Sequence, residues 1–396
     1  MTQTPARILV VLGTRPEAIK LATVINALRA TPDELTVAVC VTGQHREMLT
    51  PILELFAITP EYQLGLMTPN QKLARLTSAI LDEITPVLED FHPDWAIVQG
   101  DTTTALGACL ASFYQHIRVA HVEAGLRTND KRRPFPEEAN RRIVDSLSDL
   151  HFAPTERARR SLLAEGTDPA TVHVTGNTVI DALCQVSARE YDLGSGPLAG
   201  VPFDRRIVLV TAHRRESFGQ GMIAICRALT RLVEEVPDIQ VVYPVHLNPN
   251  VRDPVRDLLG GNPRISLLAP LDYESLVHLM RRATLILTDS GGIQEEAPTL
   301  GKPVLVLRDV TERPEAVEAG CARLVGTDAS RIVAEARQLL EDRGAYDRMA
   351  RVVNPFGDGR ASERIATVLR SGAATARSSA RDTSWRPAIE PALTPN

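Results

Sequence analysis

Residues 7–17 read RILVVLGTRPE, an unbroken apolar run followed at once by a glycine and then by a proline. A continuous apolar run of this length is typical of a strand that is buried on both faces of a parallel sheet. Gly13 permits a tight turn after the strand, and Pro16 suits the first position of a helix. This strand–turn–helix unit predicts the start of a doubly wound α/β domain.

The same alternation continues along the chain in two blocks. In the first block further apolar runs occur at 36–41, 95–99, 119–122, 150–153 and 172–174, with helical patterns between them. A Gly/Pro-rich break at 192–202 precedes the second block, whose runs lie at 206–211, 240–244, 265–268, 285–288 and 304–307. We therefore expect two Rossmann-like doubly wound domains with a central cleft, residues 1–190 and 200–370, and a disordered tail at 371–396.

Composition excludes several classes of protein. The net charge is −5 and aromatic residues make up 4% of the chain, which argues against a general nucleic-acid binder or a polybasic membrane binder. No run of about 18 apolar residues occurs, so no transmembrane helix is expected. The first apolar run is too short for a signal peptide, since Gly13, Arg15 and Glu17 follow it closely. The five cysteines are scattered without zinc-site spacing, which predicts a reducing, cytoplasmic location and no metal site.

Polar residues that follow the strands of the first block are candidate site residues, because ligands of such sheets bind at the carboxyl ends of strands. Arg15, beside a predicted helix N-terminus, suits a diphosphate or a carboxylate, although it could equally lie in solvent at an ordinary turn. Asp101 could be a helix N-cap or a carboxylate in the cleft. Glu123 has apolar neighbours just past a strand, which is unusual for a solvated surface charge.

A third carboxylate, Glu137, follows Pro136 at a predicted helix start, where a first-turn charge is the alternative interpretation. If Asp101, Glu123 and Glu137 converge on one cleft, mutual repulsion should raise the pKa of some of them. Acid–base catalysis uses such shifts.

The second block carries candidates for anion binding and proton transfer. His213 and His246 each follow a predicted strand. The Ser290-Gly291-Gly292 run precedes a helix, where successive backbone N–H groups can bind phosphates. Glu296, one turn further on, could accept hydrogen bonds from ribose hydroxyls, and Arg313 adds a cation after the following strand.

Ten short motifs together resemble the non-hydrolysing UDP-N-acetylglucosamine 2-epimerase family. In family order these are GTRPEAIK, TGQHREML, GDTTT, HVEAGLRT, PEEANR, HRRES, YPVHLNP, DSGGIQEEAP, GKPVLVLRD and TERPEAVEAG. The resemblance spans roughly residues 8–370. It implies a glycosyltransferase-B-like pair of Rossmann domains, no nicotinamide or metal, and interconversion of UDP-GlcNAc and UDP-ManNAc. The implied route eliminates UDP to give 2-acetamidoglucal and then adds UDP back.

The resemblance also implies residue roles. The matching catalytic residues are Asp101, Glu123, Glu137 and His213. The matching UDP-sugar-binding residues are Arg15, Lys20, Ser290, Gly291, Gly292, Glu296 and Arg313. Candidates for a second UDP-GlcNAc, which activates bacterial members, are Gln44, His45, Gln71, Arg214 and His246. A homodimer is implied as well, whereas the assignment of base and acid among the carboxylates stays open.

Three alternatives remain. A retaining glycosyltransferase would share the architecture but would not explain the carboxylates of the first block. A hydrolysing 2-epimerase, which releases ManNAc and UDP, would share most of the residues. A UDP-sugar-binding regulator without turnover would have no need of Asp101 or Glu137.

Overall fold

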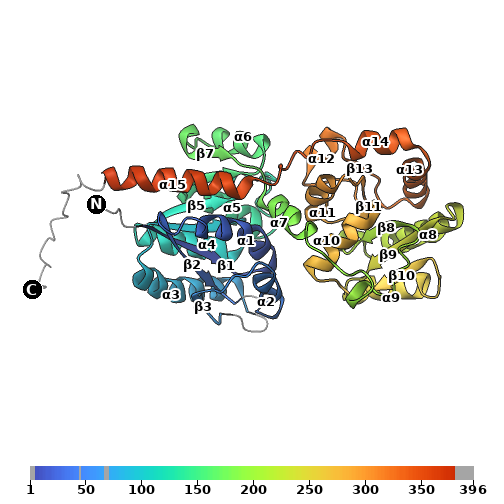
Figure 1. Cartoon of the computed structure of the whole chain (residues 1–396), viewed down its shortest axis with the longest axis horizontal. Helices are drawn as coiled ribbons and strands as arrows, with labels where there is room; N and C mark the ends of the chain where they lie inside the picture. The colour runs from blue at the N-terminus through green and yellow to red at the C-terminus, as the bar shows by residue number, and fades with distance from the viewer. Residues whose placement is uncertain (1–4, 44–45, 67–70, 380–396) are drawn as a thin grey trace, which may run out of the picture.

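The computed structural model describes residues 5–43, 46–66 and 71–379 and has two domains, each built on one parallel sheet (Figure 1). In the first sheet the strands lie in the order β3-β2-β1-β4-β5-β6-β7. Their bounds are β1 Ala6–Leu12, β2 Leu35–Val41, β3 Tyr62–Gln63, β4 Trp95–Gln99, β5 Arg118–Val122, β6 Leu150–Ala153 and β7 Val172–Val174. The helices between and after them are α1 Arg15–Arg29, α2 Arg46–Leu55, α3 Leu73–Phe91, α4 Thr103–Tyr114, α5 Glu137–Leu147, α6 Glu156–Ala164 and α7 Thr178–Ser187.

The second sheet repeats this plan in the order β10-β9-β8-β11-β12-β13. Its strands are β8 Arg206–Thr211, β9 Ile239–Pro244, β10 Ile265–Leu268, β11 Ala283–Thr288, β12 Val304–Val306 and β13 Ala322–Leu324. Its helices are α8 Gln220–Glu235, α9 Pro249–Leu259, α10 Tyr273–Arg282, α11 Gly291–Glu296, α12 Pro314–Ala319, α13 Ala329–Glu341 and α14 Arg343–Ala350. Short 3₁₀ helices are η1 Pro169–Thr171, η2 Gly196–Leu198, η3 Arg215–Ser217 and η4 Ala297–Leu300. The prediction of two Rossmann-like domains is confirmed.

Strand β1 shows why the opening sequence forms a central strand. Successive side chains of a strand point to opposite faces. Ile8 and Val10 belong to the core on the α1 side of the sheet, whereas Leu9 and Val11 belong to the core beneath α3 and α4. Since both faces are covered, every position of the run is buried and apolar. Each such side chain contributes about 1.5–3 kcal/mol of transfer free energy.

The strand orders place the candidate site. The first sheet reverses its winding between β1 and β4, and the second reverses between β8 and β11. At such switch points the loops at the carboxyl ends of adjacent strands diverge and leave a crevice. The loops after β1, β4, β8 and β11 therefore carry the residues that can reach a ligand.

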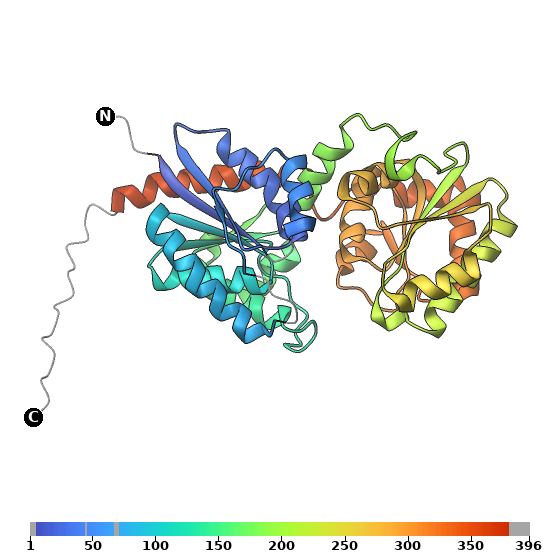
Figure 2. The same ribbon diagram turned by 90° about the horizontal axis from the view of Figure 1, so that it is seen from below.

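Helix α15, Ala361–Ser379, returns from the second domain and packs on α1 and α7 of the first (Figures 1 and 2). Its Ile365 and Leu369 are fully buried, and its Ser362 hydroxyl lies 2.8 Å from the Thr23 hydroxyl of α1. The tail was expected to begin at residue 371, and in the structure α15 continues to Ser379. The packed first half of α15 supplies the helix nucleus, and the alanine-rich sequence that follows extends it.

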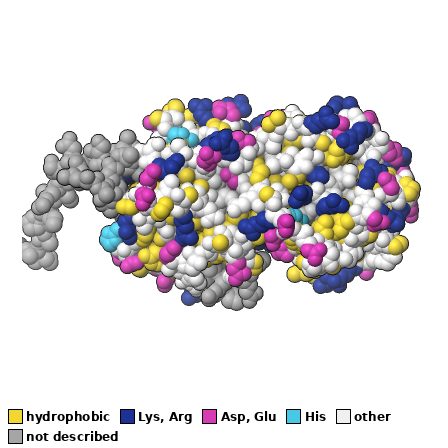
Figure 3. All heavy atoms as spheres, in the orientation of Figure 1, with side chains coloured by type: hydrophobic (Ala, Val, Ile, Leu, Met, Phe, Trp, Pro, Cys, Tyr) yellow, Lys and Arg dark blue, Asp and Glu magenta, His cyan; other side chains and the backbone are white. Residues whose placement is uncertain are grey.

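None of the helices in the described ranges is both long enough and apolar enough to cross a bilayer. Acidic and basic side chains are interspersed over the face drawn in Figure 3.

Candidate active site

A cavity of about 830 Å³ lies between the two domains. The first domain contributes the loops after β1, β4 and β5 together with parts of α1, α5 and α6, and the second contributes Arg214 and the 311–315 segment. The predicted site residues that line it are Arg15, Lys20, Asp101, Glu123, Glu137, Arg214 and Arg313. Three carboxylates and four cations thus face one space.

The N-terminus of α1 is closed by its own capping box. Glu17 Oε2 accepts hydrogen bonds from the amides of Gly13 (3.0 Å) and Thr14 (2.6 Å), and the Thr14 hydroxyl accepts from the Glu17 amide. The amides of Gly13 and Thr14, just before the helix, are therefore already bound by a carboxylate of the chain, and anion binding by Arg15 at this helix start stays a prediction. The exposed guanidinium of Arg15 remains available at the cavity edge.

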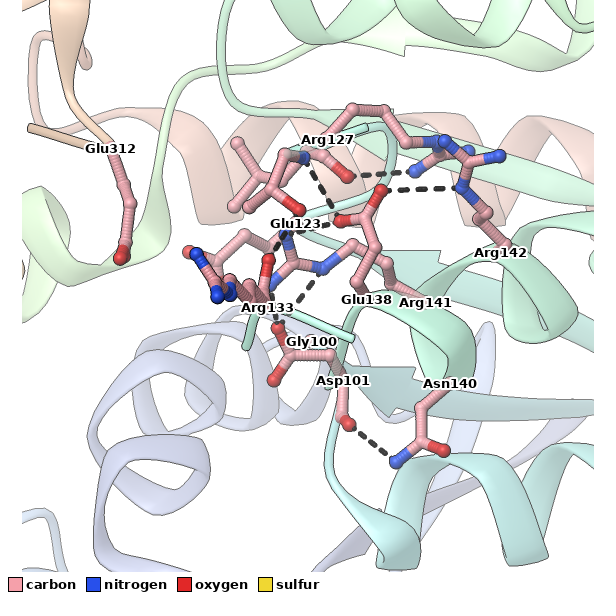
Figure 4. A network of polar contacts seen from close by, with 12 residues as sticks. Gly100, Asp101, Glu123, Arg127, Arg133, Glu138, Asn140, Arg141, Arg142 and Glu312 are labelled. Atoms are coloured by element: carbon pink, nitrogen blue, oxygen red, sulfur yellow. Dashed lines mark hydrogen bonds and ion pairs between the residues drawn. The ribbon is translucent and has the colours of Figure 1, made fainter. Parts of the chain in front are cut away.

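Asp101 is bound by α5 rather than used as a helix cap. Thr102 is the N-cap of α4, and its hydroxyl accepts from the Ala105 amide. The Asp101 carboxylate pairs with the Arg141 guanidinium, and its carbonyl accepts from the Asn140 side chain at 2.9 Å. Figure 4 shows Arg141 reaching from α5 to Asp101. The N-cap interpretation of Asp101 is thus wrong, and its carboxylate lines the cavity.

Glu123 is held in place from several directions. Its φ is 68°, a left-handed value that non-glycine residues seldom adopt and that costs on the order of 1–3 kcal/mol. Its amide donates to the Phe152 carbonyl at 3.0 Å, which fixes this conformation. Both carboxylate oxygens accept from Lys20 Nζ, at 2.7 and 2.6 Å, and Oε2 also accepts from Gln99. The surrounding structure therefore sets the direction of this carboxylate.

Cations rather than anions dominate the electrostatics of Glu123. Burial opposes ionisation, but the charges of Lys20, Arg313 and Arg141 outweigh it, so the pKa of Glu123 is lowered. The expectation that convergent carboxylates raise one another's pKa is wrong for this residue. The reason is that Glu123 lies against a basic partner, Lys20, which sequence spacing does not reveal.

Glu137 and Glu138 lie side by side at the start of α5 but have different surroundings. Glu138 is fully buried and accepts from the amides of Thr128 and Asn129 and from two arginines, so it organises the loop (Figure 4). Glu137 lines the cavity, and its buried Oε2 has no hydrogen-bond partner among the residues that the structure describes. Glu137 thus brings to the cavity a carboxylate oxygen whose hydrogen-bonding capacity the described residues leave unused.

Behind the catalytic candidates lies a buried ion cluster. Asp145 accepts from His121 Nδ1 at 2.6 Å and pairs with Arg127 at 2.7 Å. His121 Nε2 lies 2.8 Å from the Gly100 carbonyl, directly before Asp101. Burial raises the pKa of Asp145, but the charges of His121 and Arg127 lower it by more, so the pKa is lowered overall. The cluster fixes the β4–α4 turn that presents Asp101.

In the second domain, His213 leaves β8 beside a buried carboxylate. Asp289, which is fully buried, accepts from the His213 and Arg214 amides at 2.6 and 2.7 Å, and its Oδ1 lies 3.4 Å from His213 Nδ1. The His213 ring stacks on His246 with centroids 5.3 Å apart. Burial lowers the pKa of His213, and Asp289 opposes this. His213 itself is not among the described residues that line the cavity, although Arg214 beside it is.

The predicted nucleotide residues lie together at the carboxyl end of β11. Ser290 precedes Gly291 and Gly292 at the start of α11, and a Cβ at Gly291 would lie 3.7 Å from the Arg313 guanidinium. Arg313 is paired with Glu295. Glu296 is buried and accepts from the Tyr273 hydroxyl at 3.0 Å. Burial raises the pKa of Glu296 to about 8.

The candidates for a second, activating ligand are only partly brought together. Gln44 and His45 lie outside the described residues. Arg214 lines the cavity, and His246 is exposed on the stack with His213. Gln71 is half-buried in the segment before α3.

Comparison with known proteins agrees with this arrangement. A sequence profile described as UDP-N-acetylglucosamine 2-epimerase matches residues 26–370. The chain belongs to this family.

Two curated relatives share more than half of the aligned residues. The chain is 55% identical over 371 residues to a "Probable UDP-N-acetylglucosamine 2-epimerase" of Ralstonia solanacearum, covering 92% of this chain and 99% of that protein. It is 53% identical over 373 residues to the UDP-N-acetylglucosamine 2-epimerase of Escherichia coli, covering 92% and 98%.

A solved structure links the fold to a bound substrate. The chain is similar to the crystal structure of UDP-GlcNAc 2-epimerase from Neisseria meningitidis bound to UDP-GlcNAc. The TM-score is 0.83 and the identity 47%, covering 92% of this chain and all of that one. The fold prediction and the family resemblance are thereby confirmed.

Sequence reasoning missed several residues that shape the epimerase site. Gln99, Arg141, Asn177, Asp289 and Glu295 all contact candidate site residues. Gln99 ends a predicted strand, and Arg141, Asp289 and Glu295 lie inside quoted motifs, so these four positions carried a signal in the sequence. Asn177 lies outside the quoted motifs, and its contact with the site follows only from the tertiary fold.

Proposed function

We propose that the chain catalyses the reversible epimerisation of UDP-GlcNAc to UDP-ManNAc at C2, without net hydrolysis. The observation that carries the proposal is the meeting of Asp101, Glu123 and Glu137 with Lys20 and Arg313 in one cavity. Carboxylates suit proton transfer at a sugar carbon, and cations suit the charge that collects on a departing diphosphate. The names of the relatives support the same substrate.

The reaction proceeds in two halves. In the first, a protein base takes the C2 proton, the C–H electron pair forms a C1=C2 double bond, and the C1–O bond breaks so that UDP leaves. In the second, the UDP oxygen adds back to C1 while a protein acid gives a proton to the opposite face of C2. Elimination avoids building up a full carbanion on a weakly acidic sugar carbon.

The role of each residue in this reaction follows from its place in the site. Asp101, Glu123 and Glu137 surround the sugar and carry the protons, and His213 approaches from the second domain. Arg15, Lys20 and Arg313 stabilise the departing UDP. Ser290, Gly291, Gly292 and Glu296 hold the nucleotide. The glucal must be kept from escaping between the two halves, so the domains close over it.

Three further features belong to the proposal. A second UDP-GlcNAc binds beside the active site and activates the enzyme, through Gln71, Arg214 and His246 together with Gln44 and His45. The protein works as a homodimer. It acts in the cytoplasm, where the five free thiols stay reduced.

Proton NMR of the purified protein with UDP-GlcNAc in D₂O tests the reaction. We expect UDP-ManNAc that carries deuterium at C2, deuterium in the recovered UDP-GlcNAc and little free UDP. Free ManNAc with stoichiometric UDP would identify a hydrolysing enzyme instead. An unchanged spectrum would refute the proposal, and transfer of the sugar to an added acceptor would identify a glycosyltransferase.

A further inference from the structure

Asn177 lies at the junction of the two domains, and each of its polar groups is engaged. It is the N-cap of α7, where its Oδ1 accepts from the Val179 amide at 3.1 Å. Its backbone amide donates to the Phe356 carbonyl at 2.7 Å, on the segment that leads from the second domain back to α15. The residue is 2% exposed. Its position is therefore fixed by both domains before its side-chain amide is considered.

The remaining group, Nδ2, donates to two carboxylates from different domains. Glu295 Oε2 of α11 lies at 3.1 Å and Glu123 Oε1 at 3.4 Å. Two buried carboxylates cannot approach one another without a donor between them, because each must keep its hydrogen bonds and their charges repel. An asparagine amide, whose Nδ2 carries two N–H groups, is suited to stand between them.

Each of the two carboxylates also has a cationic partner. Lys20 binds both oxygens of Glu123, and Arg313 pairs with Glu295. Asn177 is thus a neutral amide between two ion pairs, one from each domain. Asn354 also donates to the Glu295 carbonyl at 2.7 Å, so the crossing segment fixes α11 as well.

We propose that Asn177 is a positioning residue that aims the Glu123 carboxylate by tying it to the Glu295–Arg313 pair of the second domain. The inference rests on the proposed function of Glu123. It assigns Asn177 no contact with substrate. Lys20 and Gln99 hold Glu123 from within the first domain, and Asn177 adds the contact that connects its carboxylate to Glu295 of the second domain. The arrangement of the domains and the direction of this carboxylate are thereby linked.

Asn177→Ser is the informative variant, because serine is also a good N-cap and preserves α7 while the bridging amide is lost. We expect kcat to fall about 10- to 100-fold, the range for losing one hydrogen bond to a charged group, and the Kd for UDP to change by less than about twofold. Asn262→Ser is the matched control. Asn262 accepts from the Arg264 amide in a surface turn of the second domain, and its substitution should leave both constants unchanged.

A double-mutant cycle with Glu295→Gln tests the tie itself. Glu295→Gln should lower kcat on its own, and Asn177→Ser combined with Glu295→Gln should lose no more than the larger single effect, within about twofold. Multiplicative losses, or a wild-type kcat in Asn177→Ser, would overturn the inference. If Asn177→Ser does not fold, a wild-type kcat in Glu295→Gln overturns it equally. Absence of epimerisation by the wild-type protein would instead count against the proposed function.

Discussion

The Lys20–Glu123 ion pair gives the sharpest prediction, because its removal leaves a buried charge behind. Lys20 Nζ lies 2.7 and 2.6 Å from the two Glu123 oxygens, and both side chains are largely buried. Lys20→Met keeps the length and apolar stem of the side chain and removes only the ammonium. The variant therefore tests the charge and leaves the packing of α1 intact.

The magnitude follows from the contacts that remain. At an effective dielectric constant of about 20, two unit charges 2.7 Å apart attract by about 6 kcal/mol. Arg313 and Arg141 stay near Glu123 and recover part of this. We expect the free energy of unfolding of the first domain to fall by about 3 kcal/mol at pH 7, the lower end of the range for breaking a buried pair from one side.

Fluorescence of Trp95, which is buried in the first domain, follows unfolding in urea once Trp385 is replaced by Phe. The double variant Lys20→Met/Glu123→Gln should recover stability to within about 1 kcal/mol of wild type, because no unpaired charge remains. Lys72→Met, at an exposed lysine, is the control and should change stability by less than about 0.5 kcal/mol.

The pH dependence supplies a second check. The pKa of Glu123 is lowered in the folded protein. Ionised Glu123 therefore adds to the free energy of unfolding above about pH 4.5, and this stabilisation is lost as the pH falls through the pKa of the folded state. Without Lys20 this pKa rises and Glu123 takes up a proton earlier. The difference in free energy of unfolding between Lys20→Met and wild type should therefore become smaller as the pH is lowered from 7 to 4. Unchanged stability of the variant at pH 7 would refute the reasoning.

Three further variants extend the test. Asp101→Asn should lower kcat at least about 100-fold, the contribution of an acid–base group, while a calorimetric Kd for UDP stays within about twofold. The pKa of Glu296 is raised to about 8, so the folded state holds a proton that the unfolded chain releases above pH 4.5, and stability falls between these values. The free energy of unfolding of Glu296→Gln, relative to wild type, should therefore be higher at pH 8 than at pH 5 by at least about 1 kcal/mol, which corresponds to about 2–4 °C in Tm. Thr14→Ala should cost about 1 kcal/mol in urea unfolding by loss of the α1 cap, and Thr14→Ser should not.

The central strands could be predicted from the sequence because helices cover both faces of each sheet. Successive residues of these strands are therefore buried, and they form continuous apolar runs. The edge strands β3, Tyr62–Gln63, and β13, Ala322–Leu324, were missed. Both are short and mix polar with apolar residues, whereas the three-residue strands β7 and β12 were predicted because their runs are rich in valine. The tail was expected from residue 371, whereas α15 continues to Ser379, because its packed first half provides a helix nucleus that the alanine-rich segment can extend.

The site shows where such reasoning stops. Strand-end positions identified Asp101, Glu123 and Arg313, which the structure places around one cavity. The charge balance did not follow, because Lys20 reaches Glu123 from a position 103 residues away and Arg141 reaches Asp101 across 40 residues. A sequence alone does not show which residue a charged side chain will pair with in the folded protein. The direction of a pKa therefore had to come from the fold.

The return of α15 to the first domain has a consequence for synthesis on the ribosome. Residues 30–360 separate α1 from α15, and at 5–20 residues per second these 331 residues take about 17–66 s to translate. During that interval the face of α1 that packs on α15 lacks that helix, while the entire second domain emerges and can fold. The first domain is thus synthesised first, but its packing is completed only after the second domain and α15 have been synthesised. Nascent chains released before residue 361 should be the ones that chaperones retain.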